Sequence, residues 1–556
     1  MDVSPLVKTL LEKRGIVGDE ATAKFLAPDY ERDTHDPFLM PDMDRAVARI
    51  LLALEQGERI GVYGDFDCDG IPGAALLHQV FHKIGHTALE VYIPHRDEEG
   101  YGFHAHAIDE LRARGVSLII TVDVGTTAVE SVAHAKALGI DVIVTDHHDV
   151  SQALPECVVV NPQRAGYPFP GLSGTGVAFK VAQALLAEGR KRGMERFIAI
   201  PEGWEKWLLD LVAIATIADM MPLVDENRAL VYWGLRVLRK TKRPGLRALA
   251  RAARMQLHDT TEDDIGFSIA PRINAASRMG TPELAFRLLS TEDAHEAEAC
   301  AAELEKLNTS RKAKVASIVK EAKKRMHARF TPEDVVTVLG DPEWKPGLLG
   351  LVATSLLSGR KGIVCVWGRD AKGKLKGSCR TDGSVSVVEL FSRAGAALEE
   401  WGGHHASGGF TVNPDAVHTL AEVLAEVRTH LPAGAEKDAR TPDASIAVRE
   451  ANWALYADLA QLAPFGSGNP KPVLRIAATI AAMKPFGKEK NHIELTLACD
   501  DTGRTCRAFE FFKTAQDFAY TPTPNASVVV TSTLERDVFR GRSAVALRLI
   551  SVEQAG

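Results

Sequence analysis

Carboxylate and imidazole side chains directly follow three short apolar segments of this 556-residue sequence. RIGVYG is followed by three acids, LIITV by one acid, and VIVT by two acids flanking two histidines: Asp65, Asp67 and Asp69, then Asp123, then Asp146, His147, His148 and Asp149. Parallel strands present their carboxyl ends at one edge of a sheet, where ligands gather. We therefore expect the three segments to be strands that deliver these side chains to one crevice.

This set of side chains favours hard divalent cations. Carboxylates with one or two imidazoles suit Mn²⁺ or Mg²⁺ better than an ion that prefers thiolates. Acids placed so close together repel one another unless cations lie between them. Two cations a few ångströms apart can activate a water molecule and stabilise the leaving oxygen of a phosphoester. The sequence thus predicts phosphoester hydrolysis with two divalent cations, Mn²⁺ or Mg²⁺, as cofactors.

Two other interpretations of these acids are open from the residues alone. The pattern Asp-x-Asp-x-Asp-Gly from Asp65 resembles the start of an EF-hand calcium loop, but that loop needs Glu at position twelve and this chain has Leu76 there. The acids could instead cap turns and helices, an interpretation that suits one such motif better than three in register. A further acid, Asp219 in the apolar segment LVAIATIADMMPL, has the same alternative role at a helix end.

Short apolar runs alternate with helix-like segments between residues 59 and 160. The strand candidates are RIGVYG, EVYIP, SLIITVD, VIVTD and CVVVN, and this spacing predicts an α/β domain with a parallel sheet and crossover helices. Helices should dominate from there to about Arg329, with the glycine-rich loop 171–176 entering one of them. The segment 304–329 has no internal Pro or Gly, which predicts one long connecting helix.

The two ends of the chain have different patterns. Residues 1 to about 45 predict a short helical lead that packs on the domain after it. From about residue 334 to 432, the segments VVTVLG, GIVCVWG and GGFTVN predict a second α/β unit, and residues 433–443 have the composition of a linker. Alternating apolar stretches after residue 444, such as IELTLA and SVVVTSTLE, predict a small β-barrel, for which the oligonucleotide-binding five-stranded barrel is one candidate.

Composition limits the class of protein. The formal net charge of −7 is unfavourable for binding nucleic acid, so local charge must carry such binding. Nine basic residues and one acid lie from Lys306 to Arg329, and a second basic run spans 236–254, although solvated helix faces explain such runs equally well. The seven cysteines include no closely spaced pair, which indicates a reducing cytoplasm. We expect neither a signal peptide nor a membrane span.

The order of four motifs resembles the signature of the Asp-His-His (DHH) phosphoesterase superfamily: GDFDCDG, VDVG, TDHH and IAD. Nearly the whole chain resembles one family within it, the RecJ single-strand nucleases. That resemblance is carried by HDPFLMPDMD, EEGYG, VVNPQ, YPFPGLSGTGVAFK, PRINAASRMG, GSCRT, GGHHASGGF and PFGSGNPKPVL. It implies a helical lead (1–45), a parallel-sheet DHH domain (46–300), a connecting basic helix (301–330), a smaller α/β DHHA1 companion domain (331–435) and a C-terminal OB-type β-barrel that binds single strands (436–556).

The resemblance also implies roles for residues that match the family's motifs. The implied metal ligands, with Asp123 as the bridge and Asp65 as an outer ligand, are Asp65, Asp67, Asp69, Asp123, His147 and Asp219. Asp123, His147 and His148 are the implied catalytic residues, with His148 as a phosphate contact and Asp146 orienting its neighbours. The implied contacts to the strand and its terminal phosphate are Arg96, Tyr101, Arg278, Ser378, Arg380, Gly403 and His404. The resemblance implies that residues 402–404 form a glycine-rich turn that faces the metals.

Three features depart from the family pattern. Cys379 and Thr381 stand where the family has Gly and Ser, and Lys345 stands in a Trp-His-x-Gly motif in place of His. After His404 the chain reads His-Ala-Ser-Gly-Gly, where the family more often has Ala-Ala-Gly at the end. These departures concern the phosphate pocket and leave the metal-ligand positions unchanged.

The resemblance implies a 5′-to-3′ exonuclease specific for single-stranded DNA. It would release 5′-mononucleotides by two-metal-ion hydrolysis in DNA repair and recombination, as a cytoplasmic monomer with single-stranded DNA as its partner and a helicase or single-strand-binding protein as candidate protein partners. One alternative is an oligoribonucleotide or small-nucleotide phosphodiesterase of the same superfamily, which typically lacks the barrel. The other is a catalytically silent replication or repair scaffold. The Asp or His at every metal-ligand position argues against this alternative.

Overall fold

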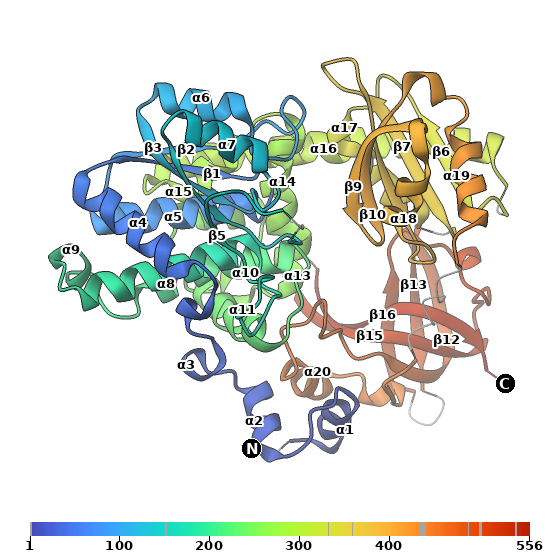
Figure 1. Cartoon of the computed structure of the whole chain (residues 1–556). Coiled ribbons are helices and arrows are strands. Elements are labelled where there is room, and N and C mark those ends of the chain that lie inside the picture. Colours follow the sequence, from blue (N-terminus) through green and yellow to red (C-terminus); the bar gives the residue numbers. More distant parts are fainter. Residues whose placement is uncertain are drawn as a thin grey trace. The chain divides into compact units, whose positions relative to one another are not determined.

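The computed structural model describes residues 3–150, 153–331, 333–358, 360–432, 441–487, 489–499, 503–539 and 542–555 (Figure 1). The chain forms two compact units. One is Tyr30–Glu436, and the other combines Met1–Asp29 with Lys437–Gly556. Within the described ranges, no helix has the length and apolar character needed to cross a bilayer.

The first sheet of the Tyr30–Glu436 unit is parallel throughout, with the strand order β2-β1-β3-β4-β5. Its strands are β1 (Arg59–Gly64), β2 (Leu89–Tyr92), β3 (Val116–Val122), β4 (Asp141–Thr145) and β5 (Val158–Val160). Successive residues of a strand point to opposite faces. In β4, Ile143 belongs to the apolar cluster on one face, and Val142 and Val144 belong to the cluster on the other. Because both faces are buried, the strands are nearly continuous apolar runs, and the predicted parallel sheet is confirmed.

Helices cover both faces of this sheet (Figure 1). One face packs against α4 (Met43–Gln56), α5 (Gly70–Ile84) and α8 (Gly174–Lys191), and the other against α6 (Ala105–Ala113) and α7 (Val129–Ala137). The predicted glycine-rich loop leads into α8, where the hydroxyl of Ser173 accepts a hydrogen bond from the N–H of Gly176 (3.1 Å) and caps the helix. α5 begins directly after the third acid of the first motif.

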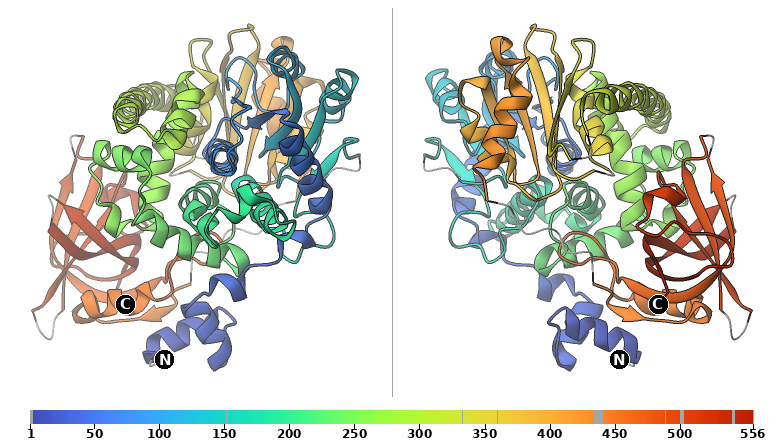
Figure 2. Two further views of the ribbon diagram at one scale, coloured as in Figure 1. Left: turned by 90° about the vertical axis from the view of Figure 1, so that its left-hand side faces the viewer. Right: turned by 90° about the vertical axis from the view of Figure 1, so that its right-hand side faces the viewer.

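A helical layer continues the first domain up to Arg329. Its elements are α3 (Tyr30–Asp33), α9 (Glu195–Ile198), the 3₁₀ helix η2 (Trp204–Leu208), α10 (Leu209–Ala218), α11 (Asp225–Leu238), α12 (Pro244–Ala252), α13 (Glu262–Asp264), α14 (Ala270–Met279), α15 (Pro282–Ser290) and α16 (Ala294–Arg329). α16 has 36 residues and a length of roughly 54 Å. It packs on α12, α14 and α15 and then on α17 (Pro346–Leu357) and β6 (Val336–Gly340), and Figure 2 views it nearly along its axis. The predicted long basic helix is therefore confirmed.

The second sheet of this unit is mixed, with the order β6-β7-β8-β10-β9. β6 and β7 (Ile363–Arg369) are parallel, and the remaining pairs, which involve β8 (Leu375–Thr381), β9 (Leu398–His404) and β10 (Ser407–Val412), are antiparallel. α17, α18 (Val387–Arg393) and α19 (Leu420–Thr429) pack on this sheet. The glycine-rich segment 402–404, which we expected to form a turn, is instead the last part of β9, because it pairs with β10.

The other unit contains a closed barrel. Its strands are β11 (Ala444–Ser445), β12 (Leu474–Phe486), β13 (His492–Ala498), β14 (Thr505–Glu510), β15 (Ser527–Phe539) and β16 (Arg542–Gln554). The order β12-β13-β14-β16-β15 closes because β15 also pairs with β12, and β14 and β16 are parallel. The predicted barrel is confirmed. Most of the predicted linker, residues 433–440, lies outside the described residues.

The N-terminal helices belong with this barrel. Val7, Leu10 and Leu11 of α1 (Pro5–Lys13) and Leu26 of α2 (Asp19–Leu26) are buried in the same apolar core as the barrel strands and α20 (Trp453–Ala460). Arg14 donates hydrogen bonds to the side chain of Asn469 (3.1 Å) and the carbonyl oxygen of Pro470 (2.8 Å). The expectation that the helical lead packs on the domain following it is therefore wrong for α1 and α2. The spacing of apolar residues predicts a buried face but not its partner.

Candidate active site

The carboxyl ends of β1, β3 and β4 lie side by side. Gly64 pairs with Val122, and Val122 pairs with Thr145. The pairing continues one residue further, since the N–H of Asp65 donates to the carbonyl oxygen of Val122 (3.1 Å) and the N–H of Asp123 to that of Thr145 (2.9 Å). The expected convergence of the three strand ends is therefore present, and α10, which ends before Asp219, contributes one more acid. The ionisable residues gathered there are Asp65, Asp67, Asp69, Asp123, His147, His148 and Asp219.

Three overlapping groups of these residues place their ligand atoms within 4.8 Å of one another. They are Asp65, Asp67 and Asp123; Asp69, His147 and Asp219; and Asp123, His147 and His148. The first two groups share no residue, so each could hold a cation of its own. Asp123 and His147 connect them, because each belongs to two groups.

The imidazole of His147 faces three carboxylates. Its Nε2 atom lies 3.1 Å from Oδ1 of Asp123, 3.6 Å from Oδ2 of Asp219 and 3.8 Å from Oδ2 of Asp69. Burial lowers the pKa of this ring, which favours the neutral form that can bind a metal ion.

The backbone of Asp123 is held in an unusual conformation. Its φ angle is 65°, in the left-handed region that non-glycine residues rarely adopt. The first residue of α8 lies directly against it, and a Cβ atom on Gly174 would be only 2.5 Å from the Cβ of Asp123. Glycine at position 174 therefore allows α8 to approach the carboxylate. Such backbone strain often occurs at functional sites.

Two of the acids also have the helix-capping role that the sequence left open. The carboxylate of Asp69 accepts hydrogen bonds from the N–H groups of Gly174 (2.6 Å) and Thr175 (2.7 Å) at the start of α8. The carboxylate of Asp67 accepts one from the N–H of Asp69 (2.8 Å), next to the start of α5. These bonds fix the orientation of the two carboxylates within the cluster.

The acids raise one another's pKa values. Burial, followed by the charge of Asp67, raises the pKa of Asp65 well above its usual value, and burial with the charge of Asp69 does the same for Asp123. Burial and the nearby Asp69 raise the pKa of Asp219 to about 8. Without positive charge nearby, the cluster thus opposes its own ionisation.

Two oxygens of the cluster receive no hydrogen bond from the residues that the structure describes. Oδ1 of Asp65 and Oδ1 of Asp123 are buried, and within the described ranges no group donates a hydrogen bond to either; the ring of His147 approaches the latter without hydrogen-bond geometry. Buried carboxylate oxygens are normally satisfied by a donor or a cation. Hard oxygen ligands with one or two imidazoles therefore fit Mn²⁺ or Mg²⁺.

His148 differs from His147 in its surroundings. Its Nδ1 atom lies 2.8 Å from Oδ1 of Asp146, and the hydroxyl of Tyr101 lies 3.1 Å from the same nitrogen. Burial lowers the pKa of His148, but the hydrogen bond and charge of Asp146 outweigh it and raise the pKa to about 9. At neutral pH this ring is a cation beside the acidic cluster, and Asp146 orients it.

A hollow of about 340 Å³ adjoins the cluster, and both domains of the unit line it. Arg96, Tyr101 and Ser378 line it, together with Phe66 and Trp401. The guanidinium of Arg96 lies 4.8 Å above the ring of Phe66. These side chains come from segments far apart in the sequence and line one hollow, and the strand contacts implied for Arg96, Tyr101 and Ser378 stay predictions.

Two further arginines lie close to this hollow. Nη1 of Arg278 donates to the carbonyl oxygen of Gly347 (2.8 Å), and burial followed by the charge of Arg96 lowers the pKa of Arg278 to about 9. Burial also lowers the pKa of Arg380, and Arg96 contributes to that shift. Gly403 and His404, both among the described residues, lie at the end of β9 and do not line the hollow.

Some contributing residues were not singled out in the sequence. The amide of Asn161 donates to the carbonyl oxygen of His148 (2.9 Å), and the side-chain oxygen of Asn274 accepts from the N–H of Cys68 (3.0 Å). Both lie within motifs that carried the resemblance, but an isolated Asn has no spacing that indicates a role. Lys345, one of the departures, forms an ion pair with Asp97 (2.8 Å) and thereby connects the two domains.

Family models match successive parts of the chain. Residues 59–216 match the DHH family, N-terminal domain, residues 333–428 the DHHA1 domain, and residues 442–551 the RecJ OB domain. A parallel sheet with an acid and histidine cluster at its carboxyl edge, followed by a DHHA1 domain, defines a protein of the Asp-His-His superfamily. The predicted fold class, a DHH domain, long helix, DHHA1 domain and OB-type barrel, is confirmed, whereas the domain boundaries remain predictions.

Curated relatives narrow this class. The single-stranded-DNA-specific exonuclease RecJ of Bacillus subtilis (strain 168) is 36% identical over 517 residues; the match covers 92% of this chain and 63% of the relative, so the chain spans less than two thirds of that relative's length. The RecJ exonuclease of Haemophilus influenzae is 30% identical over 493 residues, with 86% of this chain and 84% of the relative covered. The chain belongs to the RecJ family.

A solved structure agrees with this assignment. The crystal structure of RecJ from Thermus thermophilus in complex with Mn²⁺ is similar to this structure, with a TM-score of 0.81 and 28% sequence identity. The match covers 100% of this chain and 76% of the Thermus chain. The same protein in complex with Mg²⁺ gives a TM-score of 0.75 and 27% identity. Mn²⁺ and Mg²⁺ are thus bound by a relative with this fold, which is consistent with the donor set found here.

Proposed function

We propose that the protein is a metal-dependent exonuclease that degrades single-stranded DNA from the 5′ end and releases 5′-mononucleotides. One observation carries this proposal: two groups of acids and histidine, with two unsatisfied carboxylate oxygens, lie near a hollow lined by Arg96 and by the aromatic rings of Tyr101 and Trp401. The relatives that it resembles are named as single-stranded-DNA-specific exonucleases.

The two groups without a shared residue would each hold one divalent cation, Mn²⁺ or Mg²⁺. One position belongs to Asp65, Asp67 and Asp123, and the other to Asp69, His147 and Asp219, with Asp123 as the bridge. When bound, the cations activate a water molecule and stabilise the leaving oxygen of the phosphoester.

The remaining side chains position the substrate. His148, held at Nδ1 by Asp146, would direct its other nitrogen to a non-bridging phosphate oxygen as a charge-assisted donor. Tyr101 is half exposed in the hollow and would stack on a base of the unpaired strand. Arg96 and Arg278 would neutralise phosphates near the scissile bond.

Polarity would come from the companion domain, since the cation site alone does not distinguish one strand end from the other. Ser378 and Arg380 lie on β8 and would hold the terminal 5′-phosphate. Gly403 and His404 lie on β9, which β10 separates from β8, and we propose that they add to this contact. The planar guanidinium suits this task because it can bind two phosphate oxygens at once.

The barrel would add contacts of its own to a long strand. Barrels of this type bind unpaired nucleotides through stacking and backbone contacts, and a small-nucleotide phosphodiesterase would not need one. This feature favours the exonuclease over the alternative phosphodiesterase.

We also infer a cytoplasmic enzyme of DNA repair and recombination, and the seven free cysteines support a reducing compartment. The enzyme would act as a monomer, with a helicase or single-strand-binding protein as candidate partners.

A strand labelled at either end tests the proposal. With Mn²⁺, the full chain should release labelled mononucleotides first from the 5′-labelled strand and should leave blunt duplex intact. EDTA should stop the reaction. Early internal fragments would assign an endonuclease, and release beginning at the 3′ end would contradict the phosphate pocket.

A further inference from the structure

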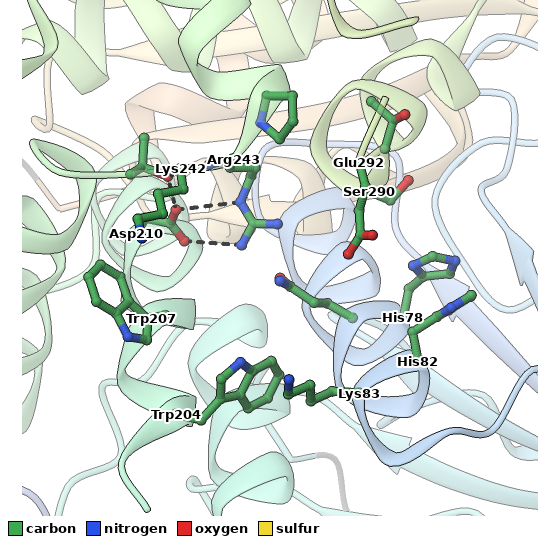
Figure 3. Close-up of a pocket in the computed structure, with 14 residues that line it drawn as sticks. His78, His82, Lys83, Trp204, Trp207, Asp210, Lys242, Arg243, Ser290 and Glu292 are labelled. Carbon is green, nitrogen blue, oxygen red and sulfur yellow. Dashed lines mark hydrogen bonds and ion pairs between the residues drawn. The ribbon is translucent and has the colours of Figure 1, made fainter. Parts of the chain in front are cut away.

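A second and larger hollow, of about 900 Å³, lies in the first domain away from the acidic cluster (Figure 3). Its walls come from the C-terminal half of α5, from η2, from the start of α10 and α12, and from the end of α15. All of these elements belong to the Tyr30–Glu436 unit. A hollow of this size is in the range that holds a small organic ligand.

Two tryptophans form an apolar wall of this hollow. Trp204 and Trp207 are three residues apart in a 3₁₀ helix, so they lie on the same side of it. Trp207 is 50% exposed, although large aromatic side chains are usually covered. Figure 3 shows both indoles beside the open space, with Lys83 next to Trp204. The ammonium of Lys83 is 5.8 Å from the centre of that ring. An exposed indole offers a flat face for stacking a base.

The charges around the hollow favour an anion. The carboxylate of Asp210 is buried, and its charge is already compensated. Nη2 of Arg243 lies 3.3 Å from Oδ1 of Asp210, and the hydroxyl of Thr241 donates a hydrogen bond to Oδ2 (2.9 Å). In contrast, neither Lys83 nor Lys242 has a carboxylate partner within the described ranges. The other acid that lines the hollow is the exposed Glu292, which Figure 3 shows beside Ser290.

Two neutral polar side chains, Gln79 and His78, also line the hollow. The side-chain oxygen of Gln79 is buried and accepts no hydrogen bond from the described residues. Burial, together with the charge of His82, lowers the pKa of His78 to about 4. His78 is therefore neutral at physiological pH and adds a hydrogen-bonding edge without a charge.

We propose that this hollow is a second nucleotide-binding site, in which a nucleoside phosphate stacks its base on Trp207 and places its phosphate between Lys83 and Lys242. The chemistry is the same for a free mononucleotide and for a nucleotide at the end of a strand. The site does not require the proposed exonuclease activity, and it shares no residue with the acidic cluster.

Calorimetric titration of the full chain with AMP tests the site. The titration is done in EDTA, so that neither hydrolysis nor cation-mediated binding contributes. AMP should bind more tightly than adenosine or inorganic phosphate, because those probes lack one half of the ligand. Hexadeoxyadenylate binding that Trp207→Ala weakens as strongly as AMP binding would assign the site to strands, and Trp207-dependent binding of AMP alone would assign it to free nucleotides; both support the proposal.

Variants locate the binding. Trp207→Ala should weaken AMP binding by about ten- to a hundredfold, and Trp207→Phe, which keeps a ring, should restore most of it. Lys242→Glu should weaken binding by about tenfold, whereas the matched Lys240→Glu and Trp453→Ala should have no effect. Exonuclease activity in Mn²⁺ should be unchanged in the Trp207, Lys242 and Lys240 variants.

Two results would overturn the proposal. One is no AMP binding up to about 5 mM, weaker than the usual range of specific sites. The other is AMP binding that survives both Trp207→Ala and Lys242→Glu. If the wild-type protein had no exonuclease activity, the proposed function would be contradicted, but the test of AMP binding would still be valid.

Discussion

Nε2 of His147 lies 3.1 Å from Oδ1 of Asp123, and these two residues connect the two groups of candidate metal ligands. Asp123→Asn keeps the shape of the side chain but removes the charge of the proposed bridge. We expect the rate of nucleotide release in Mn²⁺ to fall by at least about a thousandfold, equivalent to about 4 kcal/mol in the barrier. Circular dichroism should show an unchanged fold. Wild-type activity of this variant in Mn²⁺ would exclude the bridging role.

Gly174 has no reactive side chain, but its contact with Asp123 predicts an effect on the rate of nucleotide release. In Gly174→Ala the new Cβ would meet Asp123 at 2.5 Å, and backbone atoms there cannot move away easily. The displaced carboxylate should lower the rate by about a hundredfold. Gly176→Ala is the matched control, since its Cβ would be 3.5 Å from its nearest neighbour, and it should retain full activity. Equal rates for the two variants would show that the close approach is unimportant.

Arg380→Ala tests the terminal phosphate contact. Loss of a charge-assisted hydrogen bond worth about 1.5 to 3 kcal/mol should reduce the preference for a 5′-phosphorylated strand by about ten- to a hundredfold. The preference is the ratio of kcat/KM for strands with and without the phosphate. Arg393→Ala removes the same charge from an exposed position of the same domain and should leave the ratio unchanged. An unchanged ratio in Arg380→Ala would assign the end recognition to other residues.

The barrel should contribute affinity for long strands rather than catalysis. Because α1 and α2 share its core, the fragment that tests this is Tyr30–Glu436, which lacks both parts of the barrel unit. It should cleave very short oligonucleotides in Mn²⁺ and bind long strands more weakly than the full chain across a salt titration. A chain cut only after Glu436 would expose Val7, Leu10 and Leu11, and should aggregate. Unchanged long-strand affinity of the fragment would give the barrel another role.

His78 should make the protein sensitive to mild acid. Burial and then the charge of His82 lower its pKa to about 4, whereas a histidine in the unfolded chain titrates near pH 6.5. The neutral ring therefore stabilises the fold fully above about pH 6.5, and this contribution is lost as the pH falls toward about 4. The Tm of His78→Gln should fall less than that of the wild type between about pH 7 and about pH 5. The control is His258→Gln, at an exposed position, and its Tm should fall with pH as that of the wild type does. The same pH dependence of Tm in His78→Gln and the wild type would show that folding does not lower the pKa of His78.

The sequence by itself determined the elements of the first domain and the gathering of its acids. In a parallel sheet, each strand must be apolar on both faces and its carboxyl end must lie at one edge. The positions of Asp65, Asp123 and His147 directly after such strands were therefore enough to predict that they meet. The absence of Pro and Gly likewise predicted the helix that became α16.

Only the tertiary structure decided which surfaces meet. The apolar face of α1 is visible in the sequence, but apolar burial has no direction, so its packing on the barrel rather than on the next domain depended on the whole fold. The need for glycine at position 174 and the ion pair between Lys345 and Asp97 arise from contacts between distant segments. Local periodicity reports the neighbours of a residue along the chain, whereas these contacts depend on the packing of elements that the periodicity does not relate.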